Sequence, residues 1–160
     1  MRFFPEGGDL IAGIPTVVAF KATTPDEVPV DIAGKIVTDD GKEITTITST
    51  HDGMGSFTIE AKAGINYYAL VTVNGVQKKI LLPQAKLEGV SLQVDNTQTT
   101  KVFLTVNRSK INEWQYNKFY LIGQQLDKIV YTANVNFDEG QTAALINKKN
   151  LLPGILQLTL

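Results

Sequence analysis

Short runs of β-favouring residues separated by turn formers constrain this chain more than any other feature. Asn74-Gly75 joins two such runs, and both residues tolerate the positive φ that a type I′ hairpin turn requires. Residues 56–61 alternate, and three apolar side chains would share a face turned to a core: Phe57, Ile59 and Ala61. No long stretch repeats apolar residues every 3.6 positions, so no substantial helix is expected. The pattern predicts an all-β, antiparallel fold.

The expected strands follow from this alternation. They cover residues 16–22, 28–38, 42–50, 56–61, 67–73 and 76–82, and then 90–94, 101–106, 118–124, 128–136 and 155–160. Gly34 is expected to form a β-bulge. Residues 109–117 and 139–153 stay ambiguous, because each could hold a helical turn or a short strand.

A polar segment with Pro and Gly at its ends, residues 83–89, marks a boundary between two domains. We expect residues 1–85 and 90–160 to form two tandem immunoglobulin-like antiparallel β-sandwiches. The second domain has fewer clear strands, which is consistent with truncation at its C-terminal end. Residues 155–160 read as a strand without a closing turn. We therefore expect a fragment of a longer exported protein, with Met1 added for expression and any signal sequence upstream.

Composition excludes several kinds of chemistry. The formal net charge is −1, which gives no field to recruit nucleic acid. There is no cysteine and one histidine, so thiol catalysis, Cys-based zinc sites and two-histidine metal sites are excluded. No segment approaches the ~20 apolar residues of a membrane helix, so we expect no membrane insertion by these residues. We expect no cofactor, no bound metal and no enzymatic activity.

Two acidic turns are candidate sites. His51 beside Asp52 could act as a base oriented by a carboxylate, or it could be an ordinary turn residue. Asp39, Asp40 and Asp52 could bind calcium with loop carbonyls, but Asp-Gly pairs are common turn formers and the spacing is not that of a calcium loop. The turn interpretation is favoured in both cases.

An aromatic cluster is the remaining candidate contact surface. Its possible ligand contacts are Trp114, Tyr116 and Tyr120, with Phe119 and two lysines, Lys110 and Lys118, nearby. Stacking on a sugar, or contact with a peptide, is the functional interpretation. Packing within a sandwich is the alternative, and we favour it because aromatic residues supply much of such cores.

Several runs together resemble a known family. Residues 3–10 (FFPEGGDL), 13–15 (GIP) and 18–22 (VAFKA) resemble the start of a macroglobulin-type domain of bacterial α2-macroglobulin-like proteins. Residues 28–34 (VPVDIAG) and 51–57 (HDGMGSF) are similar to later strands and turns of that domain. Gly64 and residues 67–69 (YYA) continue the likeness. Residues 152–160 (LPGILQLTL) resemble the last strand of a second such domain.

The resemblance implies a role without catalysis. It implies a structural and interaction module of a larger bacterial cell-envelope protein, in the periplasm or at the outer membrane or cell surface, with the other domains of the parent protein as partners. The alternative is a glycan- or peptide-binding accessory module of an outer-membrane nutrient-uptake system. The chain departs from α2-macroglobulin in lacking a Cys-Gly-Glu-Gln thioester motif and a segment like the bait region. The inhibitory chemistry of that protein is therefore not expected for this chain.

Overall fold

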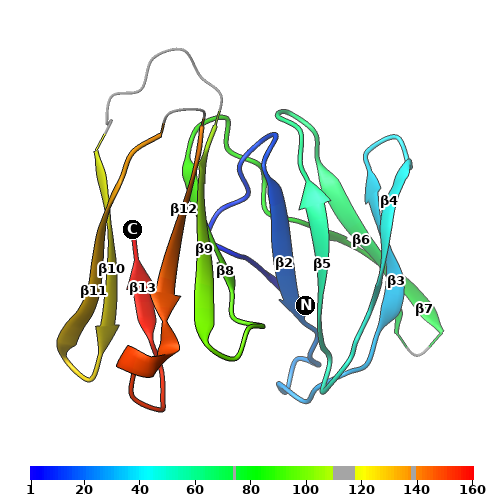
Figure 1. The fold of residues 1–160 in the computed structure, drawn as a ribbon. Helices are drawn as coiled ribbons and strands as arrows, with labels where there is room; N and C mark the ends of the chain where they lie inside the picture. The colour runs from blue at the N-terminus through cyan, green and yellow to red at the C-terminus, as the bar shows by residue number, and fades with distance from the viewer. Residues whose placement is uncertain (74, 110–117, 138–139) are drawn as a thin grey trace. The chain divides into compact units, whose positions relative to one another are not determined.

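The computed structural model describes residues 1–73, 75–109, 118–137 and 140–160, and these residues form an all-β fold of antiparallel sheets (Figure 1). The described residues contain no α-helix, and no helix among them is long and apolar enough to cross a membrane. Contacts divide the chain into two compact units, Met1–Gly89 and Val90–Leu160. We call them unit 1 and unit 2 and describe each separately.

Unit 1 contains two antiparallel sheets. Its strands are β1 (Arg2–Pro5), β2 (Pro15–Lys21), β3 (Ala33–Thr38), β4 (Glu43–Thr48), β5 (Met54–Glu60), β6 (Tyr67–Val73) and β7 (Val76–Leu81). One sheet has the order β1-β2-β5 and the other β4-β3-β6-β7. The hairpin expected at residues 74–75 joins β6 to β7, and Gly75 has the positive φ, 78°, that such a turn requires.

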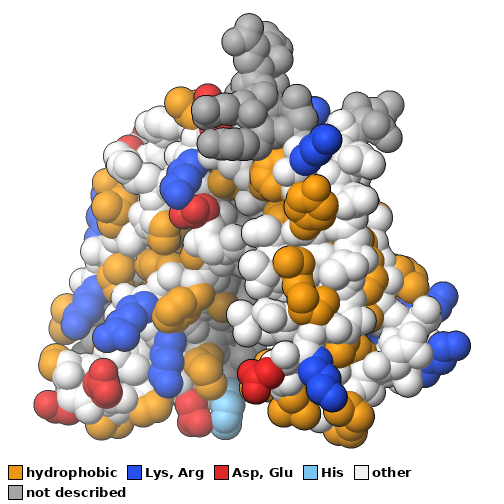
Figure 2. Space-filling model, turned by 90° about the vertical axis from the view of Figure 1, so that its left-hand side faces the viewer, with side chains coloured by type: hydrophobic (Ala, Val, Ile, Leu, Met, Phe, Trp, Pro, Cys, Tyr) orange, Lys and Arg blue, Asp and Glu red, His pale blue; other side chains and the backbone are white. Residues whose placement is uncertain are grey.

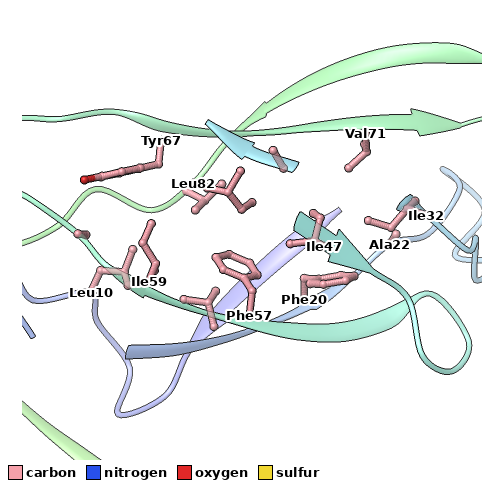
Figure 3. Packing of buried hydrophobic residues seen from close by; sticks show 14 residues of the cluster. Leu10, Phe20, Ala22, Ile32, Ile47, Phe57, Ile59, Tyr67, Val71 and Leu82 are labelled. Atoms are coloured by element: carbon pink, nitrogen blue, oxygen red, sulfur yellow. The ribbon is translucent and has the colours of Figure 1, made fainter. Parts of the chain in front are cut away.

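The core of unit 1 lies between its two sheets. Phe20 on β2 and Phe57 on β5 pack with Ile47, Val71 and Leu82, and Figure 3 shows these side chains converging. The predicted alternation of residues 56–61 is confirmed: Phe57 is 7% exposed, while Ile59 and Ala61 are buried. Period-two alternation places these side chains on one face, so the polar neighbours Thr58 and Glu60 face solvent.

Two local predictions for the third strand were wrong. The strand begins at Ala33 and not at residue 28, because the segment before it is held by another partner: the Val30 N–H donates to the Ala22 carbonyl at 3.1 Å. Pro29 also lacks the N–H that a central strand needs. Gly34 pairs regularly with both neighbouring strands, and the irregularity falls between Ile36 and Val37. A Cβ on Gly34 would stand 2.1 Å from the Leu70 carbonyl oxygen, so close strand approach requires this glycine.

The segment at the end of unit 1 is tied to its beginning. Ile11 and Lys86 form a parallel bridge, in which the Lys86 N–H donates to the Leu10 carbonyl at 2.8 Å and the Ala12 N–H to the Lys86 carbonyl at 2.9 Å. The Lys86 ammonium also lies 2.6 Å from the Asp9 carboxylate. The predicted boundary segment is therefore packed onto unit 1 rather than extended as a free linker.

The described residues of unit 2 also form two antiparallel sheets. Its strands are β8 (Val90–Asp95), β9 (Lys101–Arg108), β10 (Phe119–Gln125), β11 (Lys128–Val135), β12 (Gln141–Asn147) and β13 (Gln157–Thr159), with a 3-10 turn, η1 (Lys148–Asn150), after β12. The ambiguous segment 139–153 thus holds a strand and a helical turn. The last strand is shorter than the predicted 155–160. The sheets have the orders β12-β9-β8 and β11-β10-β13, around a core that includes Leu104, Val106 and Leu121.

The strand order of unit 1 recurs in unit 2. In each unit the first, second and fifth strands form one sheet, with the second strand in the middle. The fourth, third and sixth strands lie side by side, in that order, in the other sheet. By this correspondence β8 matches β1 and β13 matches β6. No described strand of unit 2 matches β7.

Candidate binding surfaces

The predicted aromatic contact surface is described only at one residue. Trp114 and Tyr116 lie outside the described residues. Tyr120 lies on β10, is 60% exposed and pairs with Asn134 of β11. A shallow hollow of about 170 Å³ surrounds it, lined by Lys118, Phe119, Tyr120, Asn134 and Asn136. Figure 2 views the molecule from the side on which β11 lies, where hydrophobic and charged side chains are interspersed. Tyr120 thus offers an exposed ring with amide groups beside it.

His51 and Asp52 form an exposed pair in the turn before β5. The His51 Nε2 lies 3.0 Å from an Asp52 carboxylate oxygen, and the two side chains are 75% and 63% exposed. The neighbouring hydroxyl of Thr50 donates to the Met54 carbonyl, at 3.2 Å. A contact open to water is weak and excludes no solvent from a reacting group. The arrangement is that of a surface turn.

The backbone of this turn is held more firmly than its side chains. Gly53 has φ 70°, and its carbonyl accepts from the Ala22 N–H at 2.8 Å. Its own N–H donates to the Asp31 carboxylate at 3.2 Å. A Cβ at this position would stand 2.3 Å from the Ala22 carbonyl oxygen. The glycine therefore fixes the path of the chain into β5.

The Asp39-Asp40 turn uses its carboxylates for hydrogen bonds within unit 1. Asp39 accepts from the Asn66 amide at 3.1 Å. The Thr38 hydroxyl, and then the Lys42 N–H, hold the pKa of the Asp40 carboxyl below its ordinary value. No group of three His, Asp or Glu side chains gathers to hold a metal ion in the part of the chain that the structure describes.

A cleft in unit 2 has a volume of about 460 Å³. It lies between strands of opposite sheets, since Val94 of β8 and Val102 of β9 line one side and Leu158 of β13 lines the other. The loop before β13 contributes the rest of the apolar wall, including Leu151 and Leu156. The cleft suits an uncharged, apolar side chain or segment.

A glutamine side chain holds the rim of this cleft. Gln125, at the end of β10, is buried, and its amide donates to the Leu152 carbonyl at 3.0 Å while its oxygen accepts from the Leu152 N–H at 3.0 Å. Leu126 and Asp127 follow with positive φ, 46° and 57°, and turn the chain into β11. A second hollow of about 380 Å³ adjoins this turn and shares Gln125 and Leu152 with the cleft.

Lys148, a charged residue in the lining of the cleft, is directed to backbone oxygens. Its ammonium donates to the Asn96 carbonyl at 3.2 Å and to the Gln98 carbonyl. It therefore ties the β8–β9 loop to the end of β12. Two hydrogen bonds from Thr97, and then the positive charge of Lys148, lower the pKa of the neighbouring Asp95.

Sequence reasoning did not find the cleft. Its lining residues come from β8, β9, β10, η1, β13 and the loops before β9 and β13, so no local motif marks it. One sequence feature could have pointed to an apolar surface here: residues 150–160 (NLLPGILQLTL) contain no charged side chain. Comparison of the sequence with models of known protein families and with curated proteins gives no match in either case.

Proposed function

We propose that this chain is a non-catalytic structural and interaction module of a larger bacterial cell-envelope protein, built from two immunoglobulin-like domains of the macroglobulin type. The observation that carries the proposal is the recurrence of one strand order in both units. Many cell-surface domains share the β-sandwich architecture, and two such units in tandem suit a spacer in an exported protein.

The candidate sites support a role without catalysis. The His51–Asp52 pair is open to solvent, while hydrolytic work needs a nucleophile and a base in a sheltered, pre-oriented arrangement. The unit 2 cleft is lined mainly by aliphatic side chains, and its lysine is engaged by backbone carbonyls. These surfaces suit packing against other protein segments.

Immunoblotting of fractionated cells of the source bacterium tests this proposal. An antibody raised against the chain should detect a band well above 17.5 kDa, the mass of these residues, in the envelope fraction. A 17.5 kDa band in the soluble cytoplasmic fraction would overturn the proposal.

A glycan- or peptide-binding accessory module of an outer-membrane uptake system is the second candidate. The exposed Tyr120, with the amides of Asn134 and Asn136 beside it, favours it. A glycan array probed with the original chain and with the Tyr120→Ala variant distinguishes the two candidate functions. Binding that Tyr120→Ala abolishes would favour the accessory module, and an array without specific binding would favour the structural module.

A further inference from the structure

The outer face of the β10–β11 hairpin carries no charged side chain at its outward paired positions. Leu121, Gly123 and Gln125 of β10 are buried, so period-two alternation turns the residues between them outward. Each of these lies opposite an outward residue of β11, and three rows result: Tyr120 with Asn134, Ile122 with Thr132, and Gln124 with Ile129. Charged side chains lie only beyond the two ends of this face, at Lys118 and at residues 127–128.

The polar groups on this face are available to a ligand. The side chains of Gln124, Thr132 and Asn134 form no hydrogen bond with any other part of the chain that the structure describes. Amide and hydroxyl groups can each donate and accept hydrogen bonds. Tyr120 and Ile129, at opposite ends of the face, are 60% and 61% exposed. The hairpin therefore presents unused hydrogen-bonding groups between exposed apolar side chains.

The matching sheet of unit 1 is built differently, so the fold does not require an uncharged face. In unit 1, β3 and β4 occupy the places of β10 and β11. They carry Lys35 and Glu43, whose charged groups lie 3.1 Å apart. Tyr68 on β6 has the Lys79 ammonium 3.9 Å from its ring centroid. In unit 2 the ring of Tyr120 instead borders the hollow of about 170 Å³.

The chemistry and spacing of these side chains favour a neutral ligand with repeating units. A charged ligand would lose water against this face without gaining a counter-charge there. Sugar hydroxyls donate and accept as amides do, and the apolar face of a sugar ring can pack on a tyrosine ring. Outward residues of a strand recur about every 6.6 Å, so Tyr120 to Gln124 spans about 13 Å. A linear oligosaccharide offers hydroxyl groups and ring faces at regular intervals over such a length.

We propose that the outer face of β10 and β11 binds a neutral, linear glycan that lies along the hairpin. The Tyr120 ring packs against one sugar ring. The side chains of Gln124, Thr132 and Asn134 hydrogen-bond to hydroxyl groups along the glycan. The site rests on the glycan-binding accessory role, the second candidate function, and adds to it the class of ligand and the residues beyond Tyr120. It lies wholly within residues 120–134.

Titration of the full 160-residue chain with single oligosaccharides, followed by NMR, tests the site. The neutral probes are cellohexaose, xylohexaose, mannohexaose and maltohexaose, and the anionic probe is hexagalacturonic acid. At least one neutral probe should produce saturable shifts of amide signals within residues 120–124 and 129–134. The anionic probe should bind at least about tenfold more weakly than that neutral probe, because its carboxylates meet no cation between the ends of the face.

Variants of the chain test the face itself. Gln124→Ala should weaken binding of the neutral probe about fivefold, through loss of a neutral hydrogen bond. Gln141→Ala, the same change at an exposed position of β12, should leave the affinity unchanged. Thr132→Lys should weaken binding of the neutral probe and would strengthen binding of an anionic one. Spectra of each variant establish that unit 2 remains folded, and Asn134→Ala replaces Gln124→Ala if the latter unfolds.

Four results would overturn the proposal. One is the absence of shifts within residues 120–134 with every neutral probe. Another is an affinity that Gln124→Ala leaves unchanged. The third is tighter binding by Thr132→Lys, which would assign the face to an anionic ligand. The fourth is a concentration-dependent dimer of the chain alone through this face, which would assign it to a second copy.

The proposals can fail separately. Binding on the glycan array that depends on Tyr120 but not on Gln124 would leave the accessory role standing without this site. Fractionation of the source cells tests the envelope role, whatever the outcome of the titrations.

Discussion

The side chain of Gln125 makes two hydrogen bonds of 3.0 Å with the backbone of Leu152, one donated and one accepted. The amide thus pairs with a peptide group as a neighbouring strand would. It fastens the loop before β13 to the end of β10, although the two residues are 27 positions apart.

Gln125→Leu should destabilise unit 2 by about 1–3 kcal/mol, because it leaves the partly buried N–H and carbonyl of Leu152 without their partner. Urea unfolding followed by circular dichroism measures the change. Gln141→Leu, at an exposed position of β12, is the matched control and should stay within about 0.5 kcal/mol of the original chain. Equal losses of unfolding free energy for both variants would show that the Gln125 amide has no particular structural role.

Phe57→Ala should lower the unfolding free energy by about 3–5 kcal/mol, since it removes a buried ring. The centroid of this ring lies 6.5 Å from that of Phe20 and 6.4 Å from that of Phe3. Unit 1 would then be close to unfolding, because small domains have a total stability of only about 5–15 kcal/mol. Denaturant melts of the variant give the value. A near-neutral effect would mean that the core collapses to fill the space.

His51→Ala should change the unfolding free energy by less than about 0.5 kcal/mol, because its contact with Asp52 is exposed. The same melts provide the comparison with Phe57→Ala. If His51→Ala abolishes a binding or catalytic activity of the chain, the turn is a functional site and not an ordinary surface turn.

Gly53→Ala and Gly41→Ala separate two costs of a glycine replacement. Both positions have positive φ, 70° and 84°, so each variant should lose about 1–2 kcal/mol through backbone strain. A Cβ on Gly41 meets no atom within 4 Å, whereas one on Gly53 meets two backbone oxygens below 3 Å. The loss of unfolding free energy for Gly53→Ala should therefore exceed the loss for Gly41→Ala by more than about 1 kcal/mol, as measured by chemical denaturation. Equal values would mean that the loop shifts without cost.

The Asp95 carboxylate should give unit 2 part of its acid sensitivity. Its pKa in the folded chain is lowered from 3.8 by the Thr97 hydroxyl and N–H, so its stabilising contribution is present above that value. The contribution is lost as the pH falls through the lowered folded pKa. The gap in unfolding free energy between the original chain and Asp95→Asn should therefore be larger at about pH 6 than at about pH 2. A gap that does not narrow in acid would contradict this linkage.

Local patterns predicted the parts of the fold that local chemistry determines. The alternation around Phe57 and the turn at Gly75 are two examples, since period and turn residues suffice for both. The pattern is ambiguous at β12 because residues 143–145, Ala-Ala-Leu, also favour helix, and pairing with β9 decides the outcome. β1 was not predicted, since its four residues end at Pro5 and depend on pairing with β2. The cleft was missed because it exists only where strands distant in sequence meet.

The Ile11–Lys86 bridge determines how unit 1 responds to a pull on its two ends. The paired segments run parallel, one near the start of the unit and one near its end. Tension applied through residues 1 and 89 draws them in opposite directions along their own axes. The hydrogen bonds of Leu10 and Ala12 to Lys86 are then sheared together instead of opening one after another. We therefore expect the two bonds to share the load when unit 1 is extended from its ends.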